Sequence, residues 1–336
     1  MKKDINRQGP VNVGITSEGI MAAFGIFPLF FRVNGGLPGR EIKENDMHLV
    51  VDREGNIVEA GSLQDRILEG LYCHRLGRLM LKPLVSPVFS EIGGAFLDSR
   101  FSRILIPWFI RSHAIDMKEY QRKRYASYND FFTRKLADGA RRVDKSPEAL
   151  VSPCDSRVSV IKISKKSRFP IKNTRYTVES LLEDKDLAGK YAGGYVWVFR
   201  LCVDDYHRYI YADSGRVTGI GWIPGILHTV NPVANDHFPI YKENTREYCI
   251  LQSENFGEMI QMEVGAMLVG RIRNHSRGQA VRRGWEKGRF EFGGSTVILM
   301  TKKGAAVPDR DILENSRYGL ETRVRLGERV GGKPRG

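Results

Sequence analysis

A short stretch near the C-terminal end, EFGGSTVILM (Glu291–Met300), combines residue types that could do chemistry. Two glycines, which tolerate positive φ at no steric cost, precede a serine, whose hydroxyl can act as a nucleophile once it is activated. The simplest structural interpretation is a hairpin with a Gly-Gly turn between strands at 288–292 and 295–301. From this stretch alone we favour the hairpin, so a reactive serine needs support from the rest of the chain.

Two other residues have side chains suited to acid–base chemistry. Asp155 lies in SPCDSRV and His207 lies in DDYHRYIYADSG. Taken alone, Asp155 is typical of a turn residue that caps its own backbone, and an isolated histidine after a strand is more often structural than catalytic. Five further histidines have no metal-ligand spacing such as HExxH, so we predict no metal site. These five are His48, His74, His113, His237 and His275.

The segments that must position these residues change character along the chain. Residues 1–48 are a variable extension rich in glycine, proline and polar residues, and residues 311–336 form a basic tail that we expect to be flexible. Residues 49–120 combine a short hairpin at 49–60 with apolar residues at helical spacing. Residues 121–310 are rich in strand-like runs. The predicted fold class is α+β, with a mainly antiparallel β core preceded by an N-terminal helical layer at a membrane interface.

Four runs in the second half of the chain predict strands, because β-branched and aromatic residues dominate them and glycine-containing turns separate several of them. They are residues 156–163, 195–203, 259–274 and 295–303.

The composition points to an acidic or anionic partner. The net charge is +14 and the isoelectric point is about 9.6, which suits nucleic acid or an anionic membrane surface. No nucleic-acid-binding motif is present, so we predict no nucleic-acid partner. Residues 63–117 place Leu, Ile, Phe and Trp108 between arginines and lysines, as helices in a membrane interface do. The apolar run at 19–31 contains a proline and is too short to span a bilayer.

The four cysteines have no CxxC spacing, so they indicate neither a zinc site nor a disulfide scaffold and fit a reducing compartment.

Several stretches, in order, resemble the phosphatidylserine decarboxylases, a family that makes its own pyruvoyl cofactor by self-cleavage. Together they span roughly residues 60 to 305, and their order is more specific than any one of them. The stretches are residues 115–144, LVSPCDSRV (150–158), VDDYHRY (203–209), LHTVNP (227–232), NTREY (244–248), VGAMLVGRI (264–272) and EKGRFEFGGSTVI (286–298).

The resemblance implies that Ser295 attacks the carbonyl of Gly294 in an N-to-O acyl shift. Elimination of the ester and hydrolysis then leave a covalent pyruvoyl group on a chain of residues 295–336, which stays associated with residues 1–294. The pyruvoyl group forms a Schiff base with phosphatidylserine and acts as an electron sink, releasing CO2 and phosphatidylethanolamine. Glycine suits this chemistry, because Gly294 leaves its carbonyl unhindered and Gly293 permits a strained backbone.

The resemblance also implies roles for Asp155 and His207. Asp155 matches an aspartate of the relay that activates the serine, although the family usually has Asp-Gly where this chain has Asp155-Ser156. His207 matches the first histidine of a His-Arg-x-His pattern, and Ile210 stands at the second. Either His207 serves both steps, or His228 enters, or self-cleavage is slow or absent. We hypothesise that maturation proceeds through His207.

Substrate contacts are assigned by motif alone. His228, Asn231, Asn244 and Arg246 fall in matching stretches, and Arg246 is either a bidentate ligand of phosphate or carboxylate or an exposed structural arginine. We expect a peripheral protein on the cytoplasmic side of the cell membrane that acts on a phospholipid, with a homodimer left open. The alternatives are a pyruvoyl decarboxylase of a soluble amino acid and an unprocessed relative that binds lipid.

Overall fold

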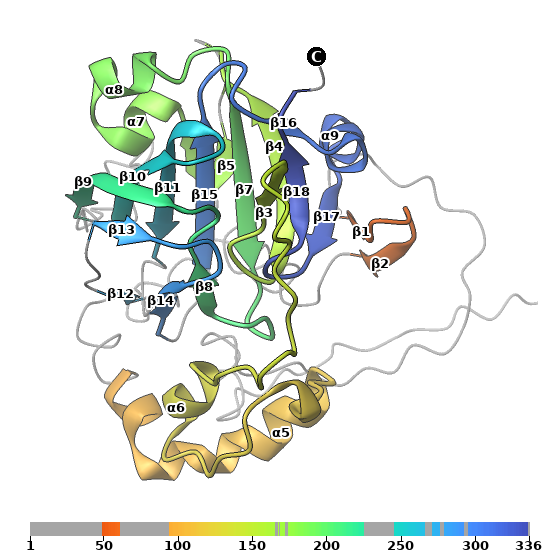
Figure 1. Cartoon of the computed structure of the whole chain (residues 1–336). Coiled ribbons are helices and arrows are strands. Elements are labelled where there is room, and N and C mark those ends of the chain that lie inside the picture. Colours follow the sequence, from red (N-terminus) through yellow and green to blue (C-terminus); the bar gives the residue numbers. More distant parts are fainter. Residues whose placement is uncertain are drawn as a thin grey trace, which may run out of the picture.

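The structure, a computed structural model, describes residues 49–60, 94–164, 167, 169–171, 174–224, 245–265, 271–275, 279–291 and 295–334. A body of β-sheets occupies the upper part of Figure 1, and a layer of short helices lies below it.

A ten-stranded sheet forms the centre of the body, in the order β13-β9-β10-β11-β15-β7-β4-β17-β1-β2. Neighbouring strands are antiparallel except β1 and β17, which run parallel. β15 lies between β11 and β7. The bounds in sheet order are Ala280–Val281, Gly215–Ile223, Arg246–Ser253, Gly257–Val264, Ser295–Thr301, Tyr195–Leu201, Ser156–Lys162, Glu321–Val324, Leu49–Val51 and Ile57–Ala60.

One face of this sheet is covered by a three-stranded sheet of β12 (Ile272–Asn274), β14 (Glu286–Phe290) and β8 (Arg208–Ile210). The main core forms between the two sheets, where Trp197 and Val297 of the large sheet share one buried cluster with Tyr209 and Phe290 of the small one. The small sheet therefore brings β8 and β14 over the face that carries Val297.

The opposite face is covered by α7 (Val178–Leu182) and α8 (Lys185–Gly189). Leu181 and Leu182 pack with Ile260 and Ile298 in a second buried cluster. The sequence starts both helices, because Thr177 closes a capping box with Ser180 and Asp184 accepts a hydrogen bond from the Leu187 N–H. β15 is thus buried on both faces, which explains the four consecutive apolar residues VILM (297–300) at its centre.

Two smaller sheets complete the β body. β16 (Val307–Pro308), β18 (Arg329–Gly332) and β3 (Ala149–Val151) form one, and β5 (Phe169–Ile171) and β6 (Thr174–Tyr176) form the other. α9 (Arg310–Arg317) packs against β4 and β17.

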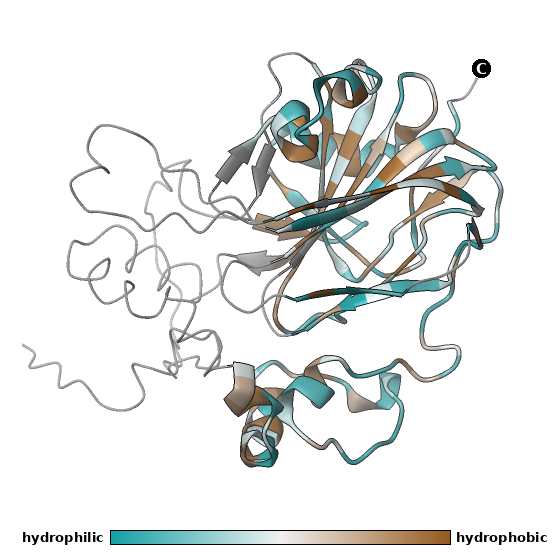
Figure 2. Ribbon diagram, turned by 90° about the vertical axis from the view of Figure 1, so that its left-hand side faces the viewer, coloured by the Kyte–Doolittle hydropathy of each residue, from teal (hydrophilic) through white to brown (hydrophobic). Residues whose placement is uncertain are grey.

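The helical layer lies below the β body (Figure 2) and has a buried apolar cluster of its own. It contains residues 94–98, η1 (Arg100–Ile104), α5 (Leu105–Ser112), η2 (Met117–Glu119) and α6 (Tyr128–Phe132). Phe109, Tyr128 and Phe131 are fully buried together, and the Tyr128 N–H donates to Ser102 Oγ at 2.8 Å. None of the helices in the described ranges is long and apolar enough to cross a membrane.

The mainly antiparallel β core, the hairpin at 49–60 and the four strand-like runs are confirmed, with one refinement. Within 259–274 the structure has two strands, since β11 ends at Val264 and β12 begins at Ile272. Helices are confirmed within 94–119, whereas residues 1–48 and 61–93 of the predicted extension and helical region lie outside the described residues.

Two expectations are wrong. Residues 288–292 and 295–301 do not form a hairpin, because β14 pairs with β12 and β8 whereas β15 pairs with β11 and β7. The expected flexible tail is folded to Lys333, since β17 joins the large sheet and β18 pairs with β3 and β16. Buried Val324 and Val330 hold this segment despite its glycines and charges.

Candidate active site

The segment around Ser295 connects the two stacked sheets. β14 ends at Phe290 in the small sheet, and β15 begins at Ser295 in the large one. The Phe290 N–H donates to the His207 carbonyl at 2.9 Å, and Ser295 pairs in register with Leu201. Gly294 lies outside the described residues. The structure therefore fixes both ends of the predicted cleavage segment on strands and brings the backbone of His207 to its upstream end.

His207 is fully buried, and its ring is oriented by two contacts. Nδ1 lies 3.0 Å from the Asp205 carbonyl oxygen, and the ring lies 4.0 Å from that of Phe132, centroid to centroid. A carbonyl oxygen can only accept, so Nδ1 must carry the hydrogen, and Nε2 of the neutral ring holds the lone pair. The arrangement suits Nε2 to accept a proton.

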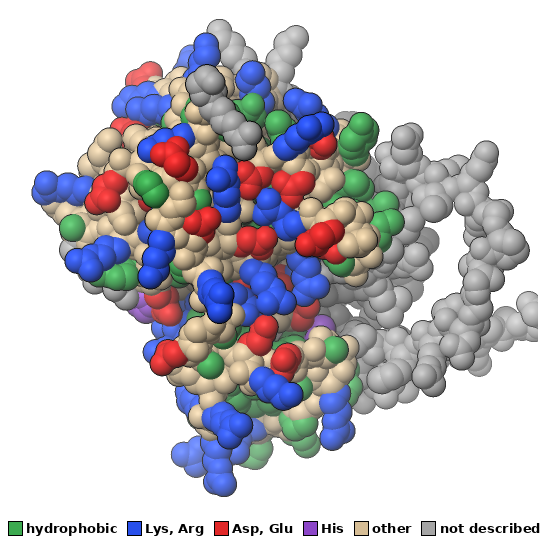
Figure 3. All heavy atoms as spheres, turned by 45° about the vertical axis from the view of Figure 1, so that its right-hand side comes forward, with side chains coloured by type: hydrophobic (Ala, Val, Ile, Leu, Met, Phe, Trp, Pro, Cys, Tyr) green, Lys and Arg blue, Asp and Glu red, His purple; other side chains and the backbone are tan. Residues whose placement is uncertain are grey.

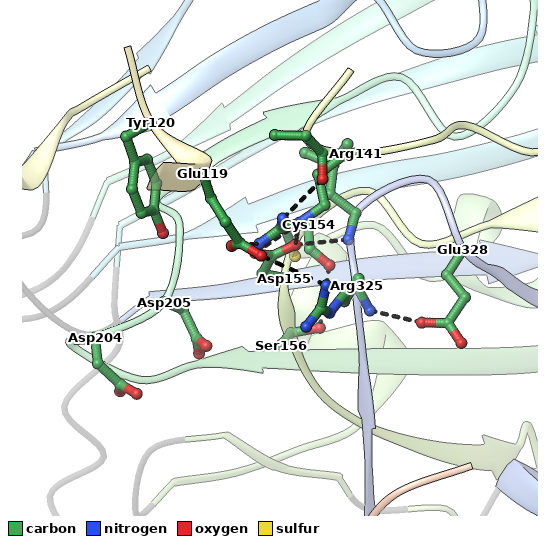
Figure 4. A network of polar contacts seen from close by, with 12 residues as sticks. Glu119, Tyr120, Arg141, Cys154, Asp155, Ser156, Asp204, Asp205, Arg325 and Glu328 are labelled. Atoms are coloured by element: carbon green, nitrogen blue, oxygen red, sulfur yellow. Dashed lines mark hydrogen bonds and ion pairs between the residues drawn. The ribbon is translucent and has the colours of Figure 1, made fainter. Parts of the chain in front are cut away.

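Asp155 is 8% exposed and is held by three backbone and side-chain donors (Figure 4). Arg141 Nε lies 3.0 Å from Oδ1 and Arg141 Nη2 lies 2.6 Å from Oδ2, while the Leu326 N–H donates to Oδ1 at 2.7 Å. Glu119 accepts from the same guanidinium at 2.9 Å. The Asp155 carboxyl group thus has a fixed cationic partner in Arg141, which sequence reasoning did not identify.

Ile210, at the position where the family pattern has a second histidine, is buried in an apolar cluster. Its neighbours include Tyr120, Tyr206 and Leu326, and Leu326 is the residue whose N–H binds Asp155. The Ile210 N–H donates to the Pro153 carbonyl at 2.9 Å. The side chain beside the Asp155 loop therefore cannot transfer a proton.

A pocket of about 190 Å³ opens between the helical layer and the β body. Its lining includes Asp155, Asp205, Arg141 and Arg325. Burial raises the pKa of Asp205 to about 7, although Arg157 lowers it. The pocket places ionisable groups of both signs beside the Asp155 carboxylate.

One group among the described residues has ligand atoms close enough for a metal. The ligand atoms of Cys202, Asp204 and Asp205 lie within 4.8 Å of one another. Arg157 forms ion pairs with both carboxylates, at 3.9 Å to Asp204 and closer to Asp205, so a guanidinium already balances their charge.

Arg246 is fully buried, so its alternative interpretation as an exposed structural arginine is wrong. Its Nη2 pairs with Glu183 at 2.8 Å, and its guanidinium lies 5.3 Å from the centroid of the Tyr176 ring. A substrate role for Arg246 stays a prediction. His228, Asn231 and Asn244 lie outside the described residues.

A buried charged pair near β15 was missed at the sequence level. Glu263 of β11 and Lys287 of β14 form an ion pair with both side chains almost completely buried. Burial raises the pKa of Glu263 against the opposing attraction of Lys287. The available signal was a glutamate inside the apolar run MIQMEV (259–264), which by itself does not indicate a partner.

The sequence is similar to those of known proteins over most of its length. The sequence model described as phosphatidylserine decarboxylase matches residues 128–332, which includes the C-terminal segment that the motifs had left out. "Phosphatidylserine decarboxylase proenzyme 2" of Clostridium acetobutylicum is 45% identical over 265 residues, covering 79% of this chain and 91% of that protein. The phosphatidylserine decarboxylase proenzymes of Ruminiclostridium cellulolyticum and Fusobacterium nucleatum are 40% and 37% identical, covering 79% and 83% of this chain and 91% and 95% of their own lengths. The chain belongs to the phosphatidylserine decarboxylase family.

Proposed function

We propose that this protein is a self-processing phosphatidylserine decarboxylase, a carboxy-lyase that converts phosphatidylserine to phosphatidylethanolamine and CO2. Membership of the family and the names of its relatives support the activity. The observation that carries the proposal for this chain is the place of Ser295. It is the first residue of β15, inside the large sheet, directly after the segment that crosses between the two sheets.

Cleavage between Gly294 and Ser295 requires the serine oxygen to replace the nitrogen on the Gly294 carbonyl carbon. Loss of the Gly294 carboxylate by elimination, and then of ammonia by hydrolysis, leaves a pyruvoyl group on the chain that starts at 295. The position fits such a group, because β15 pairs with strands on both sides and would hold a new terminus rigidly. When formed, the group supplies an electron sink for decarboxylation of an amine-bearing substrate.

The chain's own residues supply the acid–base chemistry in this proposal. His207 Nε2 takes the proton of the Ser295 hydroxyl, since Nδ1–H is committed to the Asp205 carbonyl. Asp155 contributes a fixed negative charge that Arg141 and the Leu326 N–H keep in place. Gly294 provides the unhindered carbonyl, and His228, Asn231 and Arg246 remain proposed substrate contacts.

The helical layer is the proposed membrane contact, on the cytoplasmic side of the cell membrane. Phe101 and Ile104 are 82% and 79% exposed, and the neighbouring Arg100 and Arg103 are also exposed. Apolar side chains framed by arginines suit the boundary between lipid headgroups and acyl chains. Such contact would bring the β body to its lipid substrate.

Intact mass of the freshly purified wild-type protein and of Ser295→Ala tests the proposal. We expect the wild type to give two associated chains, residues 1–294 and 295–336, the second blocked by a pyruvoyl group, and Ser295→Ala to stay intact. A single uncut wild-type chain would reject self-processing and favour an unprocessed lipid-binding relative, which the apolar Ile210 beside the Asp155 loop would explain. Release of CO2 from free serine or aromatic amino acids, and not from phosphatidylserine, would favour the soluble-substrate alternative.

A further inference from the structure

A buried polar network connects the two sheets close to Ser295. The ammonium of Lys287, on β14, contacts Glu263 Oε2 on β11, and the Nδ2 of Asn274, on β12, donates to the same oxygen at 3.2 Å. Tyr209, on β8, donates its hydroxyl hydrogen to Asn274 Oδ1 at 3.0 Å, and its ring lies 5.9 Å from Lys287 Nζ. All three strands of the small sheet thus contribute to one contact with the large sheet.

The pairing of β11 with β15 places this network close to Ser295, where the predicted cleavage segment ends. Glu263 pairs with Val297, and the following residue, Val264, pairs with Thr296. Glu263 is therefore two positions from Ser295 along the β11–β15 ladder. Lys287 lies on the strand that leads into the cleavage segment from the other sheet. The ion pair therefore links β14, which precedes the scissile bond in the chain, to β11. β11 in turn pairs with β15, the strand that begins directly after that bond.

Holding two sheets together with the Glu263–Lys287 pair carries a cost in free energy, because both charged groups lose their hydration. Glu263 is fully buried and the side chain of Lys287 is 4% exposed, so both charges have been taken out of water. Well-packed apolar residues in place of a buried ion pair are often neutral or stabilising. In addition, Glu263 Oε1 is buried with no hydrogen-bond partner among the described residues, and such an atom costs free energy. Stability alone therefore gives little reason for a charged pair at this place.

We propose that Glu263 and Lys287 are positioning residues for self-cleavage, holding β14 and β15 so that the Ser295 backbone and the residues before it keep the geometry of attack. This inference rests on the proposed function. Cleavage requires the serine oxygen to reach the preceding carbonyl carbon, and the rate of such an intramolecular step depends steeply on geometry, so that a displacement of about 1 Å can cost about 100-fold. An ionic contact between the flanking strands limits that displacement, because a charged hydrogen bond holds its two groups at a fixed distance and direction.

The test follows self-cleavage of the full-length chain over time in cell-free translation. The double variant Glu263→Gln/Lys287→Met leaves no unpaired buried charge, so it avoids the folding failure expected of either single change. We expect it to cleave about tenfold to 100-fold more slowly than wild type. In an uncleavable Ser295→Ala background, we expect the same pair of changes to alter the melting temperature little.

A matched control is available at the other end of β11. Asp213 and Arg283 form a buried ion pair beside Ser253 and Asn255, at the β10–β11 turn. The variant Asp213→Asn/Arg283→Met should cleave at the wild-type rate, even if its melting temperature falls. Wild-type cleavage by Glu263→Gln/Lys287→Met, or equal slowing in the control, would overturn the inference. An uncleaved wild-type chain would instead reject the proposed function and the inference together.

Discussion

The chemistry proposed at Ser295 depends on how two buried residues are held. The backbone carbonyl oxygen of Asp205 can only accept a hydrogen bond, so it fixes the ring hydrogen of His207 on Nδ1. Asp155 faces an arginine, and the side chain at position 210 is a buried isoleucine. Among His207, Asp155 and Ile210, only the isoleucine cannot accept a proton, and both Asp155 oxygens already accept hydrogen bonds from Arg141 or the Leu326 N–H. We therefore propose that His207 is the residue that transfers the proton in maturation.

His207→Ala should slow self-cleavage by about 10²–10⁴-fold, the usual worth of a general base. Accumulation of the uncut chain on a denaturing gel during cell-free translation measures this. His275→Gln is the control, because His275 is partly exposed and pairs with Glu286. It should cleave normally. Normal processing of His207→Ala would instead remove His207 from the relay.

Residue types were easier to predict than their partners. The sequence pointed to Asp155 and His207 through the stretches that contain them, and both are buried on the β body. It did not indicate Arg141, since Arg141-Arg142 reads as part of a basic surface until the loop brings the first of them to Asp155. Glu263 and Lys287 were missed for the same reason, because a pairing between sheets depends on how the sheets stack and leaves no spacing pattern.

At the scale of elements, the placement of β15 depends on close packing at the end far from Ser295. Gly194 immediately precedes β7, which pairs with β15 along its whole length. A Cβ built on Gly194 would lie 1.8 Å from the Thr301 carbonyl oxygen, at the far end of β15 from Ser295. No side chain fits there unless the backbone of one strand moves.

Gly194→Ala should therefore destabilise the protein by about 1–3 kcal/mol or more, as overpacking a core does. Urea unfolding in the Ser295→Ala background measures the free energy of unfolding. Gly189→Ala serves as the comparison, since a Cβ at Gly189 meets nothing within 4 Å. Gly189 is the last residue of α8, and alanine has a higher helix propensity than glycine. Equal stability of the two variants would contradict the close approach at Gly194.

The strands with strong apolar patterning could be located from the sequence, but the strands with which they pair could not. The run at 295–303 gave β15 within a few residues, yet its partners β11 and β7 come from distant parts of the chain. The predicted hairpin between 288–292 and 295–301 does not form, although the sequence Gly293-Gly294 favours a turn. Burial of β15 on both faces outweighs that local preference. The last segment was misjudged because its charges conceal the alternation of buried Thr322 and Val324.

At the scale of the whole molecule, the helical layer gives the protein a basic and apolar end (Figure 3). Some apolar side chains of this layer pack against one another in its own core, in which Phe109, Phe131 and Phe132 are fully buried. Phe101 and Ile104 are left outside that core, in a chain whose net charge is +14. An anionic bilayer satisfies both features at once, because it accepts the apolar side chains and attracts the arginines.

Phe101→Ser/Ile104→Ser should weaken binding to vesicles that contain anionic lipid at least tenfold, since burying one such side chain is worth about 1.5–3 kcal/mol. Co-sedimentation of the Ser295→Ala protein measures this without turnover of lipid. Ile220→Ser/Trp222→Ser is the matched control, because these side chains are 82% and 62% exposed but lie on β9. Raising the salt from about 0.1 M to about 1 M shortens the screening length from about 10 Å to about 3 Å, so it should weaken binding further by removing the contribution of the arginines. Loss of binding in the β9 variant, with the helical-layer variant unaffected, would place the membrane contact on β9 instead.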